Sequence, residues 1–221
     1  MPDQALFPTL VIDDFLDDPD YLSDLARSVE YKDPSYTNHP GVALATSGPG
    51  ATNLITAIAC SWFDSIPTIF ITGQVTRFRM KGNLKVRQIG FQETDIIGIS
   101  TPVTKWNYQI TRANEIPEII AKAFYIARSG RPGPVLIDIT KDAQFEKFDF
   151  TYQKCHGIRS YQPYPKLSMD SVDKAVELIN QAKKPLIVWG QGVILGNAEK
   201  DLIKFVEKSG IPAACTILGA S

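Results

Sequence analysis

The chain has 221 residues, of which 44% are hydrophobic and 21% are charged, and its formal net charge is −1. The apolar content is sufficient for one large core or two small ones. The nearly neutral charge gives no electrostatic reason to expect nucleic acid or an anionic membrane as a partner. Because no apolar run could span a bilayer and the first residues lack the pattern of a secretory signal, we predict a cytoplasmic protein.

Three cysteines, Cys60, Cys155 and Cys215, are far apart and form no CxxC pair. This spacing argues against a disulfide framework or a zinc site. Since Cys60 and Cys215 lie in apolar stretches, we expect them to be small buried side chains.

Residues 1–40 begin with an acidic segment, in which a short amphipathic helix is predicted at 21–29 after Asp20 as N-cap. The clustered aspartates lack the alternating spacing and the glycine of a calcium loop. We therefore expect a solvated acidic face and predict no metal site in the chain.

From Gly41 onward, short apolar runs alternate with helical patterns. Strands are predicted at 42–46, 67–72, 101–108 and 134–139, and helices at 51–63 and 116–128. This alternation predicts an α/β fold with a parallel sheet flanked by helices. Active sites of such sheets lie at the carboxyl ends of the strands, which directs attention to the loops after Thr46, Thr72 and Ile139.

Residues 146–167 contain charges, aromatic residues and two prolines without a clean period, and are predicted to be a linker after a first domain at 41–145. The alternation then resumes, with helices predicted at 170–182 and 198–209 and strands at 185–189 and 211–215. Two helices and two strands are few for an independent α/β domain. Residues 168–221 are therefore expected to be the truncated start of a second α/β domain.

A glycine-rich turn, Ser47-Gly48-Pro49-Gly50-Ala51-Thr52-Asn53, separates the first predicted strand from its helix. Its glycines permit a tight turn and a close backbone approach to a ligand. Asn53 occupies the place of the third glycine of a dinucleotide fingerprint, and no Gly-Lys-Ser/Thr follows as in a P-loop. On local evidence alone, a purely structural turn remains an open alternative.

Six segments follow one another in a specific order: 41–53, 64–67, 71–75, 91–96, 102–105 and 128–135. In the same order, they resemble motifs of the pyrimidine-binding domain of acetolactate synthases, which depend on thiamine diphosphate. Residues 184–193 resemble the start of that family's central domain. The resemblance runs from Gly41 to Ser221, whereas residues 1–40 do not resemble the family.

The resemblance implies a thiamine-diphosphate-binding fold in which two subunits share each cofactor, so that the whole enzyme is a homodimer or a larger oligomer. The diphosphate and Mg²⁺ would bind a separate C-terminal domain, and FAD could bind the central domain. The residues implied for the pyrimidine side are Gly48, Pro49, Gly50, Asn53 and Gln74, and those implied to face the substrate are Phe91, Gln92 and Lys141. Without the motif context, Phe91 fits a core aromatic equally well, and Lys141 a solvated charge.

Two departures from the family pattern stand out. The segment before Phe91, residues 81–90, is longer and more basic than is typical, which resembles relatives in sugar biosynthesis, although a solvated loop explains the charges too. The family's catalytic glutamate is not found upstream of the glycine turn. Glu30 lies too close to the turn and lacks the surrounding motif, so we assign no catalytic residue.

The predicted parent activity is decarboxylation of a 2-keto acid such as pyruvate, with transfer of the two-carbon unit to an acceptor. This is the transferase chemistry of acetolactate synthase in branched-chain amino acid biosynthesis, and we expect the chain by itself to be inactive. The alternatives are a thiamine-dependent enzyme of sugar biosynthesis and a non-catalytic domain that keeps only the fold and the dimer surface.

Overall fold

The structure is a computed structural model that describes residues 41–151 and 153–220, and the chain divides into two units between Pro163 and Tyr164. The helix predicted at 21–29 and the acidic segment lie outside the described residues. No helix in the described ranges has the length and apolar character needed to cross a membrane.

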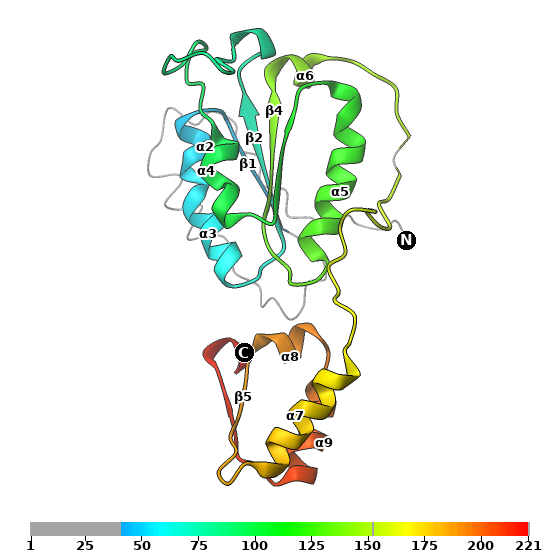
Figure 1. The fold of residues 1–221 in the computed structure, drawn as a ribbon. Helices are drawn as coiled ribbons and strands as arrows, with labels where there is room; N and C mark the ends of the chain where they lie inside the picture. The colour runs from blue at the N-terminus through cyan, green and yellow to red at the C-terminus, as the bar shows by residue number, and fades with distance from the viewer. Residues whose placement is uncertain (1–40, 152, 221) are drawn as a thin grey trace, which may run out of the picture. The chain divides into compact units, whose positions relative to one another are not determined.

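The first unit is built on a four-stranded parallel sheet with the order β1-β2-β4-β3 (Figure 1). The strands are β1 (Gly41–Ala45), β2 (Thr68–Gln74), β3 (Trp106–Ile110) and β4 (Val135–Thr140). All three strand pairings are parallel, which confirms the predicted fold class. The central strands β2 and β4 are mostly buried, β4 more completely than β2, because helices cover both faces of the sheet.

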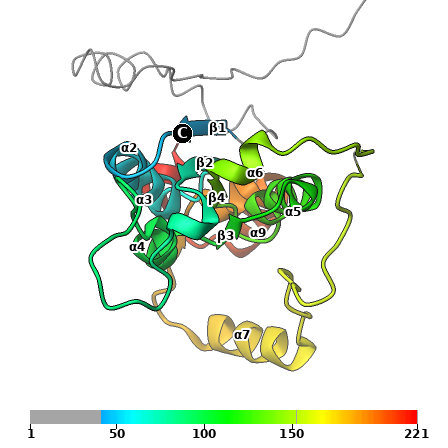
Figure 2. The ribbon, with the colours of Figure 1, turned by 90° about the horizontal axis from the view of Figure 1, so that it is seen from above.

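Successive residues of β2 and β4 face opposite sides of the sheet and define two cores. Ile69 and Ile137 pack with α5 (Ile116–Arg128) and α6 (Lys141–Phe145). Phe70 and Leu136 pack on the other face, with helices α2 (Pro49–Asn53), α3 (Ile55–Phe63) and α4 (Ile96–Ser100). Figure 2 shows these two helical layers on either side of the strands.

Several short elements differ from the prediction. The strand predicted at 101–108 is wrong in its first part, because Thr101–Val103 form a 3₁₀ turn around Pro102 and β3 begins at Trp106. The helix predicted at 51–63 is divided at Leu54 into α2 and α3. Helices α4 and α6 have five residues each, which is too short for a periodic apolar pattern to reveal them.

The end of the predicted linker packs on the first unit. Ile158 and Tyr161 join the core on the α5 face, and the Tyr161 hydroxyl donates a hydrogen bond to the Ser129 carbonyl at 3.3 Å. Gly130 has a φ of +61°, and a Cβ there would lie 2.8 Å from Pro163. The close approach at Gly130 therefore depends on glycine.

The second unit contains helices α7 (Met169–Gln181), α8 (Gln191–Leu195) and α9 (Glu199–Ser209) beside a two-stranded parallel sheet of β5 (Ile187–Trp189) and β6 (Ala213–Cys215). Within residues 164–220, Ile211 is the one hydrophobic side chain that is buried. Cys215 is exposed, as is Cys60 in the first unit, so the prediction that both are buried is wrong. The reason is that neither α3 nor β6 is covered on its outer side by described residues.

Candidate functional site

The loops that follow β1, β2 and β4 meet at the carboxyl edge of the sheet, because these three strands are neighbours. A Cβ at Gly48 would lie 2.7 Å from the Gln92 carbonyl oxygen, and a Cβ at Gly90 would lie 2.8 Å from Val75 Cγ1. Both contacts are possible only because glycine has no side chain. As a result, the turn of residues 90–93 packs closely against the glycine turn and against the end of β2.

Gln92 has a left-handed backbone with a φ of +58°, and Gly48 facing it has a φ of +63°. A left-handed conformation outside glycine is uncommon and costs roughly 1 kcal/mol or more. The Glu93 N–H closes the turn by donating to the Gly90 carbonyl at 3.1 Å. The strained turn presents the Phe91 ring to solvent with 79% of the residue exposed, while Gln92 is half-buried.

The other residues of the glycine turn differ in exposure. Gly48 and Gly50 are buried, and a Cβ at Gly50 would lie 2.6 Å from Thr46 Cγ2. Pro49 and Asn53 lie on the exposed side of α2, and the Asn53 carboxamide has no hydrogen-bond partner among the described residues. Asn53 is therefore available to a ligand, whereas the two glycines shape the turn.

Gln74, which the resemblance implies for the pyrimidine side, lies at the end of β2. Its side chain is buried, and its Nε2 donates to the Thr94 carbonyl at 2.8 Å and to Asp138 Oδ2 at 3.1 Å. Its Oε1 accepts from the Val75 N–H at 2.9 Å. With every polar atom of its amide engaged, Gln74 ties the end of β2 to the segment after Gln92.

Asp138, to which the sequence interpretation assigned no role, is fully buried in the middle of the sheet. Its carboxylate accepts hydrogen bonds from Thr72 Oγ1 at 2.7 Å, from Gln109 Nε2 at 2.8 Å and from Gln74. Burial raises the pKa of Asp138, and the three hydrogen bonds oppose that rise. A single acidic residue inside the apolar run Val135–Thr140 was the available sequence signal, since a buried carboxylate requires donors.

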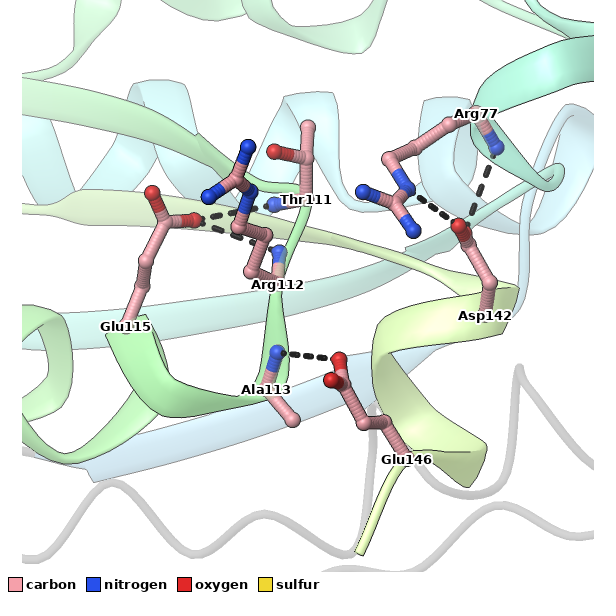
Figure 3. Close-up of polar contacts among 7 residues, drawn as sticks. All are labelled: Arg77, Thr111, Arg112, Ala113, Glu115, Asp142 and Glu146. Atoms are coloured by element: carbon pink, nitrogen blue, oxygen red, sulfur yellow. Dashed lines mark hydrogen bonds and ion pairs between the residues drawn. The ribbon is translucent and has the colours of Figure 1, made fainter. Parts of the chain in front are cut away.

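Lys141 is exposed at the first position of α6, beside an ion pair between Arg77 and Asp142 (Figure 3). The Arg77 N–H also donates to Asp142 Oδ1 at 3.2 Å. Burial acts to raise the pKa of Asp142, but its hydrogen bonds, above all that from Arg77, outweigh burial and lower the pKa. The pair joins the segment after β2 to the start of α6.

The start of the β3–α5 connection is held by two glutamates, also drawn in Figure 3. Glu115 accepts from the Thr111 N–H at 3.2 Å, and Glu146 accepts from the Ala113 N–H, also at 3.2 Å. These bonds satisfy backbone donors after β3 and fix that corner of the edge.

Two further features bear on what the edge can bind. Among the described residues, no group of three or more His, Cys, Asp or Glu side chains could hold a metal ion. A surface cavity of about 580 Å³ is lined by Lys122 and residues 157–160, and none of the predicted site residues contributes to it. The candidate site is built from the loops at the carboxyl edge of the sheet and from the turn of residues 90–93.

Comparisons with known proteins agree with the motif order. Residues 30–99 match the thiamine pyrophosphate enzyme N-terminal TPP binding domain, and residues 172–221 match the central domain of the same enzymes. The acetolactate synthase large subunit of Corynebacterium glutamicum is 44% identical over 182 residues, which are 82% of this chain and 28% of that protein.

Two further relatives show the same relation. The acetolactate synthase large subunit of Buchnera aphidicola is 42% identical over 83% of this chain and 31% of its own length. The acetolactate synthase 1, chloroplastic, of Nicotiana tabacum is 42% identical over 83% of this chain and 26% of its own length. The chain thus spans less than a third of these relatives. With its parallel sheet, its ordered motifs and both domain matches, the chain belongs to the thiamine-pyrophosphate-dependent enzymes and is similar to acetolactate synthase large subunits.

Proposed function

We propose that the chain supplies the pyrimidine-binding half of a thiamine-diphosphate cleft in an acetolactate-synthase-like transferase. The observation that carries the proposal is the packing of Gly48 against Gln92. It joins two motifs that are 44 positions apart in the sequence at the carboxyl edge of the sheet. This is the edge at which parallel α/β sheets bind their ligands.

The described residues differ in how readily they could contact the aminopyrimidine. Asn53 offers an exposed carboxamide that has no hydrogen-bond partner among the described residues, and Phe91 offers an exposed ring on the turn that contacts Gly48. Gly48, Pro49 and Gly50 shape the backbone beside them. Gln74 would reach the cofactor only by giving up one of its internal hydrogen bonds. We therefore propose that it holds the end of β2 in place rather than contacting the cofactor.

When bound, thiamine diphosphate supplies the nucleophilic carbon on which a 2-keto acid is decarboxylated. In this proposal Phe91 and Gln92 border the substrate, and Lys141 provides positive charge near the mouth of the cleft. Mg²⁺, FAD, a second subunit that completes the cleft and a cytoplasmic location belong to the proposal for the whole enzyme. Glu30, the upstream glutamate considered for catalysis, lies outside the described residues.

A second candidate function is a non-catalytic binding domain. It is favoured by the state of two carboxylates at this edge of the sheet, because Asp138 and Glu93 are both occupied by internal hydrogen bonds. An assay of the 221-residue chain with pyruvate, thiamine diphosphate and Mg²⁺ distinguishes the two only when product forms, because absence of product is expected of the isolated chain in both cases. Formation of acetolactate would rule out the non-catalytic alternative.

Titration with thiamine, which carries no phosphate, tests the proposed cleft directly. We expect amide chemical shifts at residues 46–53 and 90–95 to move, and Asn53→Ala to weaken the binding. Asn180→Ala, on an exposed position of α7, is the matched control and should leave binding unchanged. If thiamine moved no signal in either loop, or if both variants weakened binding equally, the proposed site would be wrong.

A further inference from the structure

Residues 81–89 form a loop whose two ends are held together by one side chain. Glu93 Oε1 accepts from the Lys81 N–H at 2.6 Å, and its Oε2 accepts from the Ile89 N–H at 2.9 Å. Hydrogen bonds to an ionised acceptor are among the strong ones in proteins. The loop is thus closed before any ligand arrives, and part of the entropy of ordering it is already lost.

The closed loop is attached to the candidate cleft. Glu93 belongs to the same turn as Gln92, whose carbonyl faces Gly48, and Gly90 lies against Val75 at the end of β2. A ligand bound by the loop would therefore lie beside the turn that carries Phe91.

The charge of this segment is strongly one-sided. Between residues 76 and 94 the cations are Arg77, Arg79, Lys81, Lys85 and Arg87, and Glu93 is the one acidic residue. Asp142 neutralises Arg77, and the Glu93 carboxylate is used by backbone N–H groups. Among the described residues, no carboxylate forms an ion pair with Lys85 or Arg87, which are both exposed.

The loop offers more positive charge than a keto acid needs for binding, because one cation is sufficient for a single carboxylate. Two cations on a preformed loop, neither with an ion-pair partner among the described residues, match a ligand with two or more negative charges. The exposed side chains of Leu84 and Val86 alternate with the cations and can contact the uncharged part of such a ligand.

We propose that the loop of residues 81–89 binds a phosphate-bearing acceptor substrate, with Lys85 and Arg87 contacting the phosphate and Glu93 positioning the loop. This inference rests on the proposed function, since it takes the neighbouring turn to be part of a thiamine cleft. It specifies the chemical class of the acceptor as a phosphorylated small molecule, in place of the unphosphorylated 2-keto acid that accepts the two-carbon unit when acetolactate forms.

The test uses inorganic pyrophosphate as the probe, at constant ionic strength, with the 221-residue chain. We expect saturable binding with amide shifts confined to residues 81–93, and at least about tenfold weaker binding in the double variant Lys85→Gln with Arg87→Gln. Acetate, as a single charge, should bind at least about tenfold more weakly than pyrophosphate. The matched control, Lys183→Gln with Lys184→Gln, removes two exposed adjacent cations of the second unit and should change nothing.

Glu93→Gln tests the positioning role. It should weaken pyrophosphate binding and accelerate trypsin cleavage after Lys85 and Arg87, whereas cleavage after Lys183 should keep its rate. The proposal is overturned if pyrophosphate does not bind, if its shifts lie outside residues 81–93, if acetate binds equally well, or if the loop and control variants behave alike. Because thiamine has no phosphate, loss of thiamine binding with retained pyrophosphate binding would refute the cleft but not the loop.

Discussion

The two units of the chain have the same alternation of helices and strands but differ in what they bury. In the first unit, β4 lies between β2 and β3, and Val135, Leu136 and Ile137 are fully buried. In the second unit, β5 has one partner among the described residues, and Val188 in its centre is 65% exposed. A parallel strand becomes a core element only when it has neighbours on both sides and helices over both faces.

The same contrast applies to the helices. The inner face of α5 is covered by the sheet, and Ile119, Ala123 and Ile126 are buried there. The amphipathic helices α7 and α9 keep Leu178 and Ile203 exposed by more than half. Amphipathicity therefore predicts a helix in both units, but it does not determine whether the apolar face finds a partner.

The largest effect should come from the buried carboxylate of the first unit. Asp138→Ala would remove the acceptor of donors on Thr72 and Gln74, which are buried, and on Gln109, which is half-buried, and should destabilise that unit by about 3 kcal/mol or more. Hydrogen exchange followed on peptides from both units would show loss of protection in residues 41–163 but not in residues 164–220. Equal loss in both would contradict the separation of the units.

Asp138 also makes the first unit sensitive to pH. Because burial raises the pKa of Asp138 above its unfolded value, the folded state binds the proton more tightly. Its contribution to stability is complete below the unfolded pKa of about 3.8 and is lost as the pH rises through the folded pKa. Asp138→Asn should remove this dependence. Denaturant midpoints measured from acidic to neutral pH check the expectation, which fails if the variant and the parent lose stability in parallel.

Two valines, one in a strand of each unit, allow the effect of burial on stability to be compared directly. Val135→Ala removes two methyl groups from a fully buried position and should cost about 1.5 to 3 kcal/mol. Val188→Ala, at an exposed strand position, should change stability by no more than about 0.5 kcal/mol. Local opening free energies from hydrogen exchange give both values. A large loss at Val188 would mean that β5 is covered in solution.

Substitution of Lys105, which lies at the amino edge of the sheet just before β3, should have an intermediate effect on stability. Its Nζ donates to the carbonyls of Ile126 and Ser129 at 2.5 and 2.6 Å, and Lys105→Met would remove both bonds, leaving these carbonyls with the longer hydrogen bonds from Ser129 Oγ and the Tyr161 hydroxyl, at a cost of roughly 1 to 3 kcal/mol. Burial lowers the pKa of Lys105 from 10.5 to about 8, so the unfolded state binds its proton more tightly. Stability should rise with pH between about 8 and 10.5 in the parent and stay flat in the variant. If stability rose with pH in both the parent and the variant, the rise would come from another titrating group.

The smallest effect should come from a glycine at the end of α9. Gly210 has a φ of +63°, and a Cβ there would meet nothing within 4 Å. Gly210→Ala should therefore cost about 1 kcal/mol through the backbone alone. Gly192→Ala, a helical position with equally open space, is the control and should be neutral or slightly stabilising. Similar destabilisation by both would indicate that the space is filled in solution.

The candidate site was predictable in its parts but not in its geometry. The glycine turn and the Phe91-Gln92-Glu93 segment stand out in the sequence, and local rules place them in loops after strands. That Gly48 would contact Gln92 could not be predicted, because the contact depends on how two distant loops pack. The same holds for Gln74, whose type suits a ligand site but whose amide is used inside the sheet.

The sequence by itself determined the alternation of strands and helices, the parallel sheet and the family motifs, because apolar periodicity and turn residues are local signals. The tertiary structure alone decided that β4 lies between β2 and β3, that Asp138 is satisfied by three donors and that Glu93 closes the basic loop. Each of these depends on residues brought together from distant positions, and the free energy of such contacts arises only when the strands have paired and water has left the space between them.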